Sequence, residues 1–168
     1  LFCDDAGAVI LEADEKASGT IEERGIFSCH LYADGRYQNI LQTSGGISTT
    51  GDSGHILMEG KEVFRHAVNN FSGVSNEVFE ANNITSEDVD WLVFHQANIR
   101  IIEAAAKKLK LNMDQVVITV DRHGNTSAAS IPLALADAVK SGRIKQGDML
   151  LMEAMGAGLT WGATLVRF

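Results

Sequence analysis

The pattern that most constrains this fold is the alternation, after residue 60, of helix-like segments with short apolar runs. Apolar residues that recur at three- and four-residue steps predict helices with one buried face over residues 61–80, 99–110 and 127–141. Apolar runs of strand length predict buried strands over residues 91–94, 116–120, 148–154 and 159–166. Helices that alternate with buried strands are typical of an α/β fold, and a tight turn between the last two strands indicates a mixed sheet.

The first sixty residues carry a different pattern, without a helical period. Residues 6–12 and 25–33 are rich in apolar and β-branched side chains, which predicts two strands. Asp34-Gly35 is typical of a tight hairpin turn, so residues 36–42 are expected to form the return strand. Residues 43–55 are turn-forming almost throughout and predict a long loop, which lies either on the free surface or against a substrate.

Length, charge and cysteine content narrow the class of protein. At ~150 residues per domain, 168 residues predict one domain. The 14 basic and 22 acidic residues give a net charge of −8, the opposite of what a general nucleic-acid binder shows. No apolar run reaches the ~18 residues of a membrane span, and no signal-peptide pattern is visible, so we expect a cytoplasmic protein. Neither Cys3 nor Cys29 lies at an expected helix start, and both are predicted to be small core residues.

Polar residues follow the apolar run at 91–94. The sequence HQAN at 95–98 lies where that strand ends and a helix begins, which is the usual position of the ligand crevice in α/β proteins. The partial positive charge of a helix amino terminus favours a neutral imidazole at His95, and a neutral imidazole can donate a hydrogen bond to a carbonyl oxygen. The alternative is a structural histidine that is hydrogen-bonded at a strand end.

A second polar group, HGNTS at 123–127, occupies the equivalent position after the next expected strand. Asn125 and His95 could therefore converge on one ligand atom. Thr126 and Ser127 are more simply explained as helix-capping residues. For Asn125 the capping and the ligand-binding interpretations both stay open.

Two further features each have a functional and a structural interpretation. The turn Gly156-Ala157-Gly158 precedes a strand and not a helix, so it is not a phosphate loop. It either lets backbone N–H groups approach a substrate closely, as an oxyanion site requires, or is an ordinary hairpin turn. The basic residues between Arg100 and Lys110 are, by themselves, typical of a solvated helix face.

Three segments together resemble one enzyme family. VFHQAN at 93–98, DRHGNTSAAS at 121–130 and EAMGAGLTWGATLVRF at 153–168 are similar to β-ketoacyl-acyl-carrier-protein synthase III, with 30 positions from His95 to Asn125. The resemblance implies a thiolase-like fold, which in these enzymes consists of two similar halves. Residues 1–168 resemble the carboxy-terminal half, so the amino-terminal half is expected to be absent.

The resemblance also implies roles for individual residues. His95 and Asn125 match two members of a Cys-His-Asn triad whose cysteine belongs to the absent half. The backbone N–H of Ala157 matches an oxyanion donor, at a position where the family usually has glycine. The positions that match the lining of the pantetheine tunnel are Gly60, Phe64, Ala97 and Asn98. The positions that match the docking site for the carrier protein are Arg100, Lys107 and Lys108.

The activity implied by this resemblance is the condensation that initiates type II fatty-acid synthesis. Acetyl-CoA and malonyl-acyl-carrier protein would give acetoacetyl-acyl-carrier protein with loss of CO₂. The resemblance implies a homodimer, no metal or cofactor beyond the thioester substrates, and no nucleic-acid or membrane partner. Without the cysteine, the chain alone is expected to be inactive. Two alternatives stay open: a related triad synthase that makes a quinolone or polyketide, or a non-catalytic half-domain that only dimerises or binds carrier protein.

Overall fold

A four-stranded sheet forms the centre of the computed structural model, which describes residues 2–15 and 18–168. The strand order is β1-β6-β5-β4. The strands are β1 (Gly25–Ala33), β4 (Trp91–Phe94), β5 (Met149–Gly156) and β6 (Thr160–Arg167). β4 and β5 are parallel, whereas β6 is antiparallel to both β5 and β1, so the predicted mixed sheet is confirmed.

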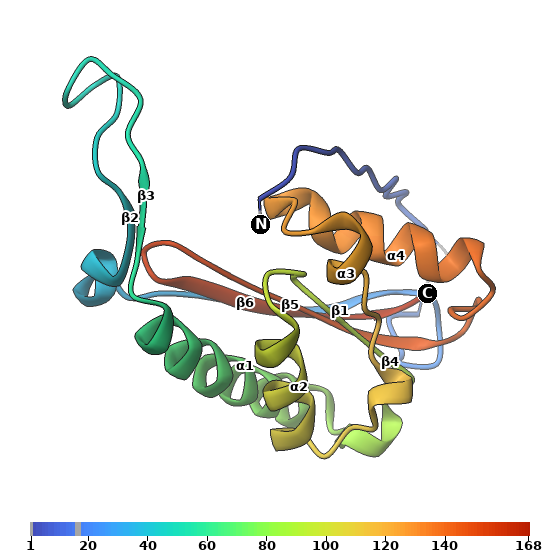
Figure 1. Cartoon of the computed structure of the whole chain (residues 1–168). Coiled ribbons are helices and arrows are strands. Elements are labelled where there is room, and N and C mark those ends of the chain that lie inside the picture. Colours follow the sequence, from blue (N-terminus) through green and yellow to red (C-terminus); the bar gives the residue numbers. More distant parts are fainter. Residues whose placement is uncertain (1, 16–17) are drawn as a thin grey trace.

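Helices cover both faces of this sheet (Figure 1). The α-helices are α1 (Gly60–Asn82), α2 (Ile99–Lys108), α3 (Val120–His123) and α4 (Ser130–Lys140). The short 3-10 helices are η1 (Gly35–Ile40), η2 (Ser86–Asp88), η3 (Met113–Gln115) and η4 (Ser127–Ala129). α1 packs on β1, β5 and β6 and also contacts α2, while α4 packs on β4 from the opposite face. No helix among the described residues is long and apolar enough to cross a membrane.

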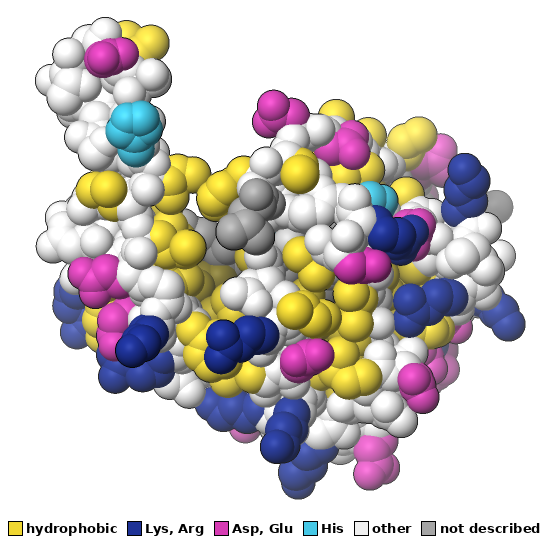
Figure 2. Space-filling view, in the orientation of Figure 1, with side chains coloured by type: hydrophobic (Ala, Val, Ile, Leu, Met, Phe, Trp, Pro, Cys, Tyr) yellow, Lys and Arg dark blue, Asp and Glu magenta, His cyan; other side chains and the backbone are white. Residues whose placement is uncertain are grey.

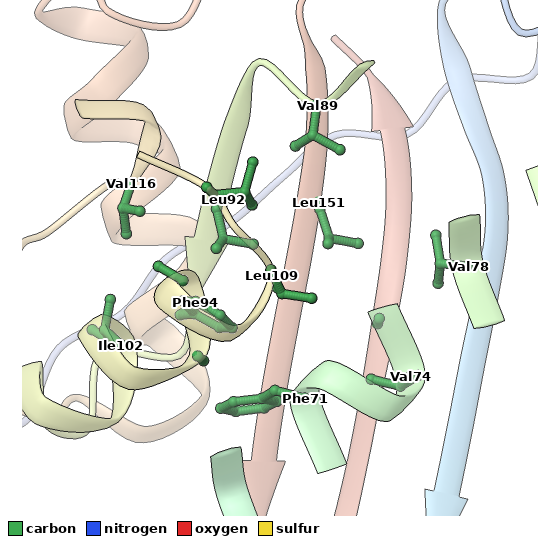
Figure 3. Packing of buried hydrophobic residues seen from close by; sticks show 14 of the residues in the cluster. Phe71, Val74, Val78, Val89, Leu92, Phe94, Ile102, Leu109, Val116 and Leu151 are labelled. Carbon is green, nitrogen blue, oxygen red and sulfur yellow. The ribbon is translucent and has the colours of Figure 1, made fainter. Parts of the chain in front are cut away.

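The main core lies between the sheet and the helices α1 and α2 (Figure 3). Leu92 and Phe94 of β4 and Leu151 of β5 are fully buried there. The Phe71 ring of α1 lies 5.0 Å from the Phe94 ring, centroid to centroid. Fully burying such a side chain contributes ~1.5–3 kcal/mol, so this contact fixes the end of β4 against α1. The carboxyl end of β4 is therefore a rigid position for the residues that follow it.

The predicted return strand over residues 36–42 is wrong. Most of this segment forms η1, which begins after Asp34, whose carboxylate accepts a hydrogen bond from the Arg36 N–H at 3.1 Å. Asp34 also exchanges backbone hydrogen bonds with Leu159, because β1 pairs with β6 and not with the next segment along the chain. The chain then enters β2 (Leu41–Thr43), which pairs with β3 (Ile56–Met58) in a ribbon that protrudes from the body (Figure 1).

Two other predicted strands are not formed. Residues 6–12 have no regular structure and pair with no strand in the described part of the chain, and Ile10 is 90% exposed. Residues 116–120 make only one bridge, Leu92 to Val116, before the chain turns into α3 at Val120. The strands predicted over residues 25–33 and 91–94 are confirmed with these bounds. The remaining predicted helices and strands are confirmed with shifted ends, and the helix predicted from residue 127 starts as η4.

Both cysteines are exposed, so their prediction as core residues is wrong. In β1, Ser28 bonds to Asn82 of α1, which places Ser28 on the face that α1 covers. Cys29 points to the opposite face, as does Leu31, which is 80% exposed. α4 packs on β4 at the other edge of the sheet, so this part of the face stays open, with an apolar hollow of ≈ 560 Å³.

Candidate active site

A cavity of ≈ 1220 Å³ brings the predicted motifs together. The predicted residues that line it are His95, Asn125, Ala157, Gly60, Phe64, Ala97, Asn98 and Arg100. Lys107 and Lys108 lie outside the cavity, exposed on α2. Figure 2 shows apolar side chains gathered where the protruding ribbon meets the body. Residues from distant parts of the sequence, His95 and Asn125 among them, thus line one cavity.

His95 is the first residue after β4. Its backbone N–H donates to the Glu153 carbonyl at 2.8 Å, which continues the parallel pairing with β5 by one step. Its ring Nδ1 lies 2.6 Å from the Ser130 hydroxyl, and its Nε2 has no hydrogen-bond partner in the described part of the chain. Burial lowers the pKa of His95 below its ordinary value, because a charged imidazolium is poorly solvated there. At neutral pH the ring is therefore neutral.

Gln96 connects the His95 loop to the segment that leads to Asn125. Its side chain is fully buried and makes four hydrogen bonds to the backbone. The amide donates to the carbonyls of Phe94 and Val117, and its oxygen accepts from the N–H groups of Thr119 and Val120. Because every one of these groups is satisfied, the two loops are held at a fixed separation. No sequence pattern indicates this role of Gln96.

Asn125 follows α3 through a turn that depends on glycine. Gly124 has φ 65°, a left-handed conformation that residues with a Cβ rarely adopt. The Asn125 side-chain oxygen accepts from the Ser127 N–H at 2.9 Å, and its backbone oxygen accepts from the Cys3 N–H at 2.9 Å. Its Nδ2 group has no hydrogen-bond partner among the described residues, so the Nδ2 hydrogens remain available to a ligand in the cavity.

The other predicted residues frame the entrance and the walls. Asn98 caps α2, its side-chain oxygen accepting from the Arg100 N–H at 2.9 Å. The Arg100 guanidinium lies 5.9 Å from the centre of the Phe64 ring, so α1 and α2 meet at this point of the cavity. Ala157 is exposed to the cavity in the turn between β5 and β6.

The β2–β3 ribbon provides a wall of the cavity that no sequence motif indicated. The ribbon residues that line the cavity are Leu41, Gln42, Thr43, Ile56 and Met58. The sequence left open whether the loop predicted over residues 43–55 lies on the free surface or against a substrate. Thr43 lines the cavity, whereas residues 44–55 do not. The sequence signal is weak because both strands are only three residues long.

Comparison with known proteins decides the family. The model for the carboxy-terminal part of 3-oxoacyl-[acyl-carrier-protein] synthase III matches residues 79–168. The chain belongs to this synthase III family. It is 59% identical over 168 residues to the β-ketoacyl-[acyl-carrier-protein] synthase III of Allorhizobium ampelinum, a match that covers 100% of this chain and 52% of that relative. The chain thus spans about half the length of the curated synthase III relatives it matches.

Solved structures agree with this assignment. The 3-oxoacyl-[acyl-carrier-protein] synthase III of Aquifex aeolicus superposes with a TM-score of 0.81 at 41% identity, over 89% of this chain and 46% of that one. The priming β-ketosynthase of the R1128 polyketide pathway superposes with a TM-score of 0.76 at 33% identity, over 84% of this chain and 44% of that one. The predicted fold, the carboxy-terminal half of a thiolase-like α/β enzyme of the synthase III family, is confirmed.

Proposed function

We propose that residues 1–168 are the carboxy-terminal half of a condensing acyltransferase that initiates type II fatty-acid synthesis. The full-length protein would join acetyl-CoA to malonyl-acyl-carrier protein, release CO₂ and form acetoacetyl-acyl-carrier protein. One observation carries this proposal: His95 and Asn125 reach one cavity from separate loops, and in each side chain one polar atom is already bonded within the protein. The Nε2 of His95 and the Nδ2 of Asn125 are left to the ligand.

Two N–H donors that line one cavity suit the decarboxylation of a malonyl thioester. When the bond to the carboxylate breaks, its electron pair moves into the thioester, and negative charge collects on the thioester oxygen. Donors fixed in advance at such an oxygen contribute ~3–4 kcal/mol each to the transition state. A neutral His95 donates without also acting as an acid, so the enolate that forms keeps its negative charge for the next step.

The enolate carbon would then attack an acyl group held on the cysteine of the amino-terminal half. A carbon–carbon bond forms, the tetrahedral oxyanion collapses, and the cysteine leaves as thiolate. We propose that the backbone N–H of Ala157, together with that of the cysteine, holds this oxyanion. The position of Ala157 in the cavity, in the turn after β5, supports this role.

The shape of the cavity supports a pantetheine thioester as the ligand. Its length runs from the start of α1 to the loops that carry His95 and Asn125, with apolar walls from Phe64 and the ribbon. The residues that we propose line this tunnel are Gly60, Phe64, Ala97 and Asn98. A cavity with apolar walls and polar donors in its lining fits a flexible arm that carries a reactive thioester at its tip.

We propose that the carrier protein docks on the basic residues of α2, next to the cavity. The whole chain is acidic, with net charge −8, yet Figure 2 shows Lys and Arg side chains gathered on the side formed by α1 and α2. Arg100 lines the cavity, and Lys107 is exposed further along the helix. Lys108 donates to the side-chain oxygen of Asn69 at 2.8 Å, which holds its ammonium group over α1. A local cationic surface would attract an acidic carrier.

Reversing two of these charges tests the docking surface. In the full-length protein, Lys107→Glu with Lys108→Glu should raise KM for malonyl-acyl-carrier protein several-fold and leave the acetyl-CoA half-reaction unchanged. The defect should shrink as salt is added, because exposed charges act mainly on association and are screened. The matched control is Lys140→Glu with Lys145→Glu, two exposed residues outside the cavity. An equal rise in KM for both pairs would contradict the proposed dock.

The proposed activity is tested with the full-length protein, acetyl-CoA and malonyl-acyl-carrier protein. Mass spectrometry should detect acetoacetyl-acyl-carrier protein, and CO₂ should be released in an equimolar amount. We propose that the full-length protein acts as a cytoplasmic homodimer. Residues 1–168 alone should take up no label from acetyl-CoA, because the nucleophile is expected in the other half. Preference for a different primer would favour a polyketide- or quinolone-type synthase, and no CO₂ release at all would favour a non-catalytic binding module.

A further inference from the structure

A buried serine hydroxyl lies directly against the His95 ring. Ser130, the first residue of α4, is 2% exposed. Its oxygen has two hydrogen-bond partners in the described part of the chain: the Gln96 backbone N–H at 3.2 Å and the His95 Nδ1 at 2.6 Å. The start of α4 does not use this hydroxyl, since no side chain caps that helix. Both of its interactions go to the loop that carries His95.

The number of hydrogens on each group decides which group donates in the Gln96–Ser130 and Ser130–His95 hydrogen bonds. The Gln96 N–H can only donate, so the Ser130 oxygen accepts from it. The hydroxyl has a single hydrogen, and among the described residues His95 Nδ1 is its one remaining hydrogen-bond partner able to accept. If Nδ1 carried the ring proton, that proton would point at the oxygen and the hydroxyl hydrogen would be buried without an acceptor, which is costly.

We propose that Ser130 is a positioning residue that donates to Nδ1 of neutral His95 and so keeps the ring proton on Nε2. Nε2 is the ring nitrogen without a protein partner among the described residues, and His95 lines the cavity. The opposite tautomer would present a lone pair at Nε2 and would repel the developing negative charge of an enolate. The consequence for catalysis rests on the function proposed above, whereas the tautomer itself does not.

The surroundings hold Ser130 in the orientation that this role needs. Gln96, whose N–H binds the hydroxyl, is itself fixed by its four side-chain hydrogen bonds to the backbone. α4 packs on β4, the strand that ends at the residue before His95. The hydroxyl and the ring are therefore anchored through the same pair of elements, so their contact does not depend on a flexible surface loop.

The tautomer can be read directly from the full-length protein with ¹⁵N-labelled histidine. In the parent, the long-range ¹⁵N–¹H spectrum of His95 should show a protonated Nε2 and an unprotonated Nδ1, which resonates far downfield. In Ser130→Ala the ring should populate the Nδ1–H form. Ser141→Ala, at the other end of α4, where the hydroxyl bonds to the Ala138 carbonyl, is the matched control and should leave the spectrum unchanged. A protonated Nδ1 in the parent, or no change in Ser130→Ala, would overturn the proposal.

Activity provides the second readout. Decarboxylation of malonyl-acyl-carrier protein should fall about tenfold in Ser130→Ala, because only part of the population then has a donor at Nε2. The acid limb of the pH–rate profile for decarboxylation should move to higher pH, since loss of a donor to Nδ1 makes the neutral ring less stable relative to the imidazolium. Ser130→Thr, which keeps the hydroxyl, should recover the parent spectrum and pH profile. A changed tautomer with an unchanged decarboxylation rate would uphold the role of Ser130 and overturn the proposed role of His95.

Discussion

Replacing either His95 or Asn125 with alanine in the full-length protein should slow the decarboxylation of malonyl-acyl-carrier protein by ~100-fold or more. Each substitution removes one N–H donor from the point where the thioester oxygen becomes negatively charged. The remaining donor cannot compensate, because each side chain is fixed by its own contact, His95 by Ser130 and Asn125 by the Ser127 N–H. Release of labelled CO₂ from malonyl-acyl-carrier protein, measured without a primer, isolates this step.

The acyl-enzyme provides the internal control for this experiment. Both variants should still form an acetyl thioester from acetyl-CoA, since that step uses the cysteine and the backbone oxyanion donors. Matched substitutions outside the cavity, His55→Ala in the ribbon loop and Asn76→Ala on the exposed face of α1, should leave CO₂ release at the parent rate. Near-parental CO₂ release in both His95→Ala and Asn125→Ala would remove the basis for the enolate mechanism.

These two residues could be found from the sequence because their signal is local. Each follows an apolar run: His95 comes directly after β4, and Asn125 comes after residues 116–120 and α3. The run over 116–120 makes one bridge to β4 and is not a strand of the sheet, so the hydrogen bonds of Gln96 hold the two loops together. Ser130 has no such signal, since a serine near the start of a helix is normally explained as a capping residue. Only the fold shows that its hydroxyl bonds to His95 and not to the helix start.

Strand pairing marks the limit of the sequence prediction. The Asp34-Gly35 pair is a local signal for a hairpin, but β1 obtains its partner from β6 at the other end of the chain. Hydrogen bonds to β6 satisfy the edge of β1, so the residues after Asp34 are free to form η1. The same limit explains Cys29: alternation along β1 gives two faces, and only the packed structure shows which face α1 covers.

A buried carboxyl group behind the active site has its own consequence for stability. Glu153 of β5 is 1% exposed, and its backbone carbonyl accepts from the His95 N–H. Ser75 of α1 contacts one of its carboxyl oxygens and bonds to the Phe71 carbonyl at 2.8 Å, while the other carboxyl oxygen has no partner among the described residues. Burial raises the pKa of Glu153 to about 8, although the bond to Ser75 opposes this shift. At neutral pH the folded protein therefore holds a neutral carboxylic acid.

Glu153 should make the stability of the protein fall as the pH rises. The folded protein keeps this proton up to about pH 8, whereas the unfolded chain releases it near its ordinary pKa of 4.5. Between these values the folded state binds more protons, so the free energy of unfolding decreases with rising pH. The shift corresponds to a decrease of up to about 5 kcal/mol in the free energy of unfolding, and this decrease is complete once the pH exceeds the folded pKa. Below the unfolded pKa, both states are protonated and the contribution of Glu153 is fully retained.

Glu153→Gln should remove this dependence, because a glutamine amide has nearly the shape of the protonated acid and can donate to the Ser75 oxygen without losing a proton. Urea unfolding of the full-length protein should give similar midpoints for parent and variant at about pH 5 and a clearly higher midpoint for the variant at about pH 9. Glu80→Gln, on the exposed face of α1, is the matched control and should show no such divergence. A parent and a Glu153→Gln variant that stay parallel from acid to alkaline pH would mean that Glu153 is ionised in the folded protein. Its burial would then require a cation or a water beside the unpartnered oxygen, since an isolated buried carboxylate is too costly to persist.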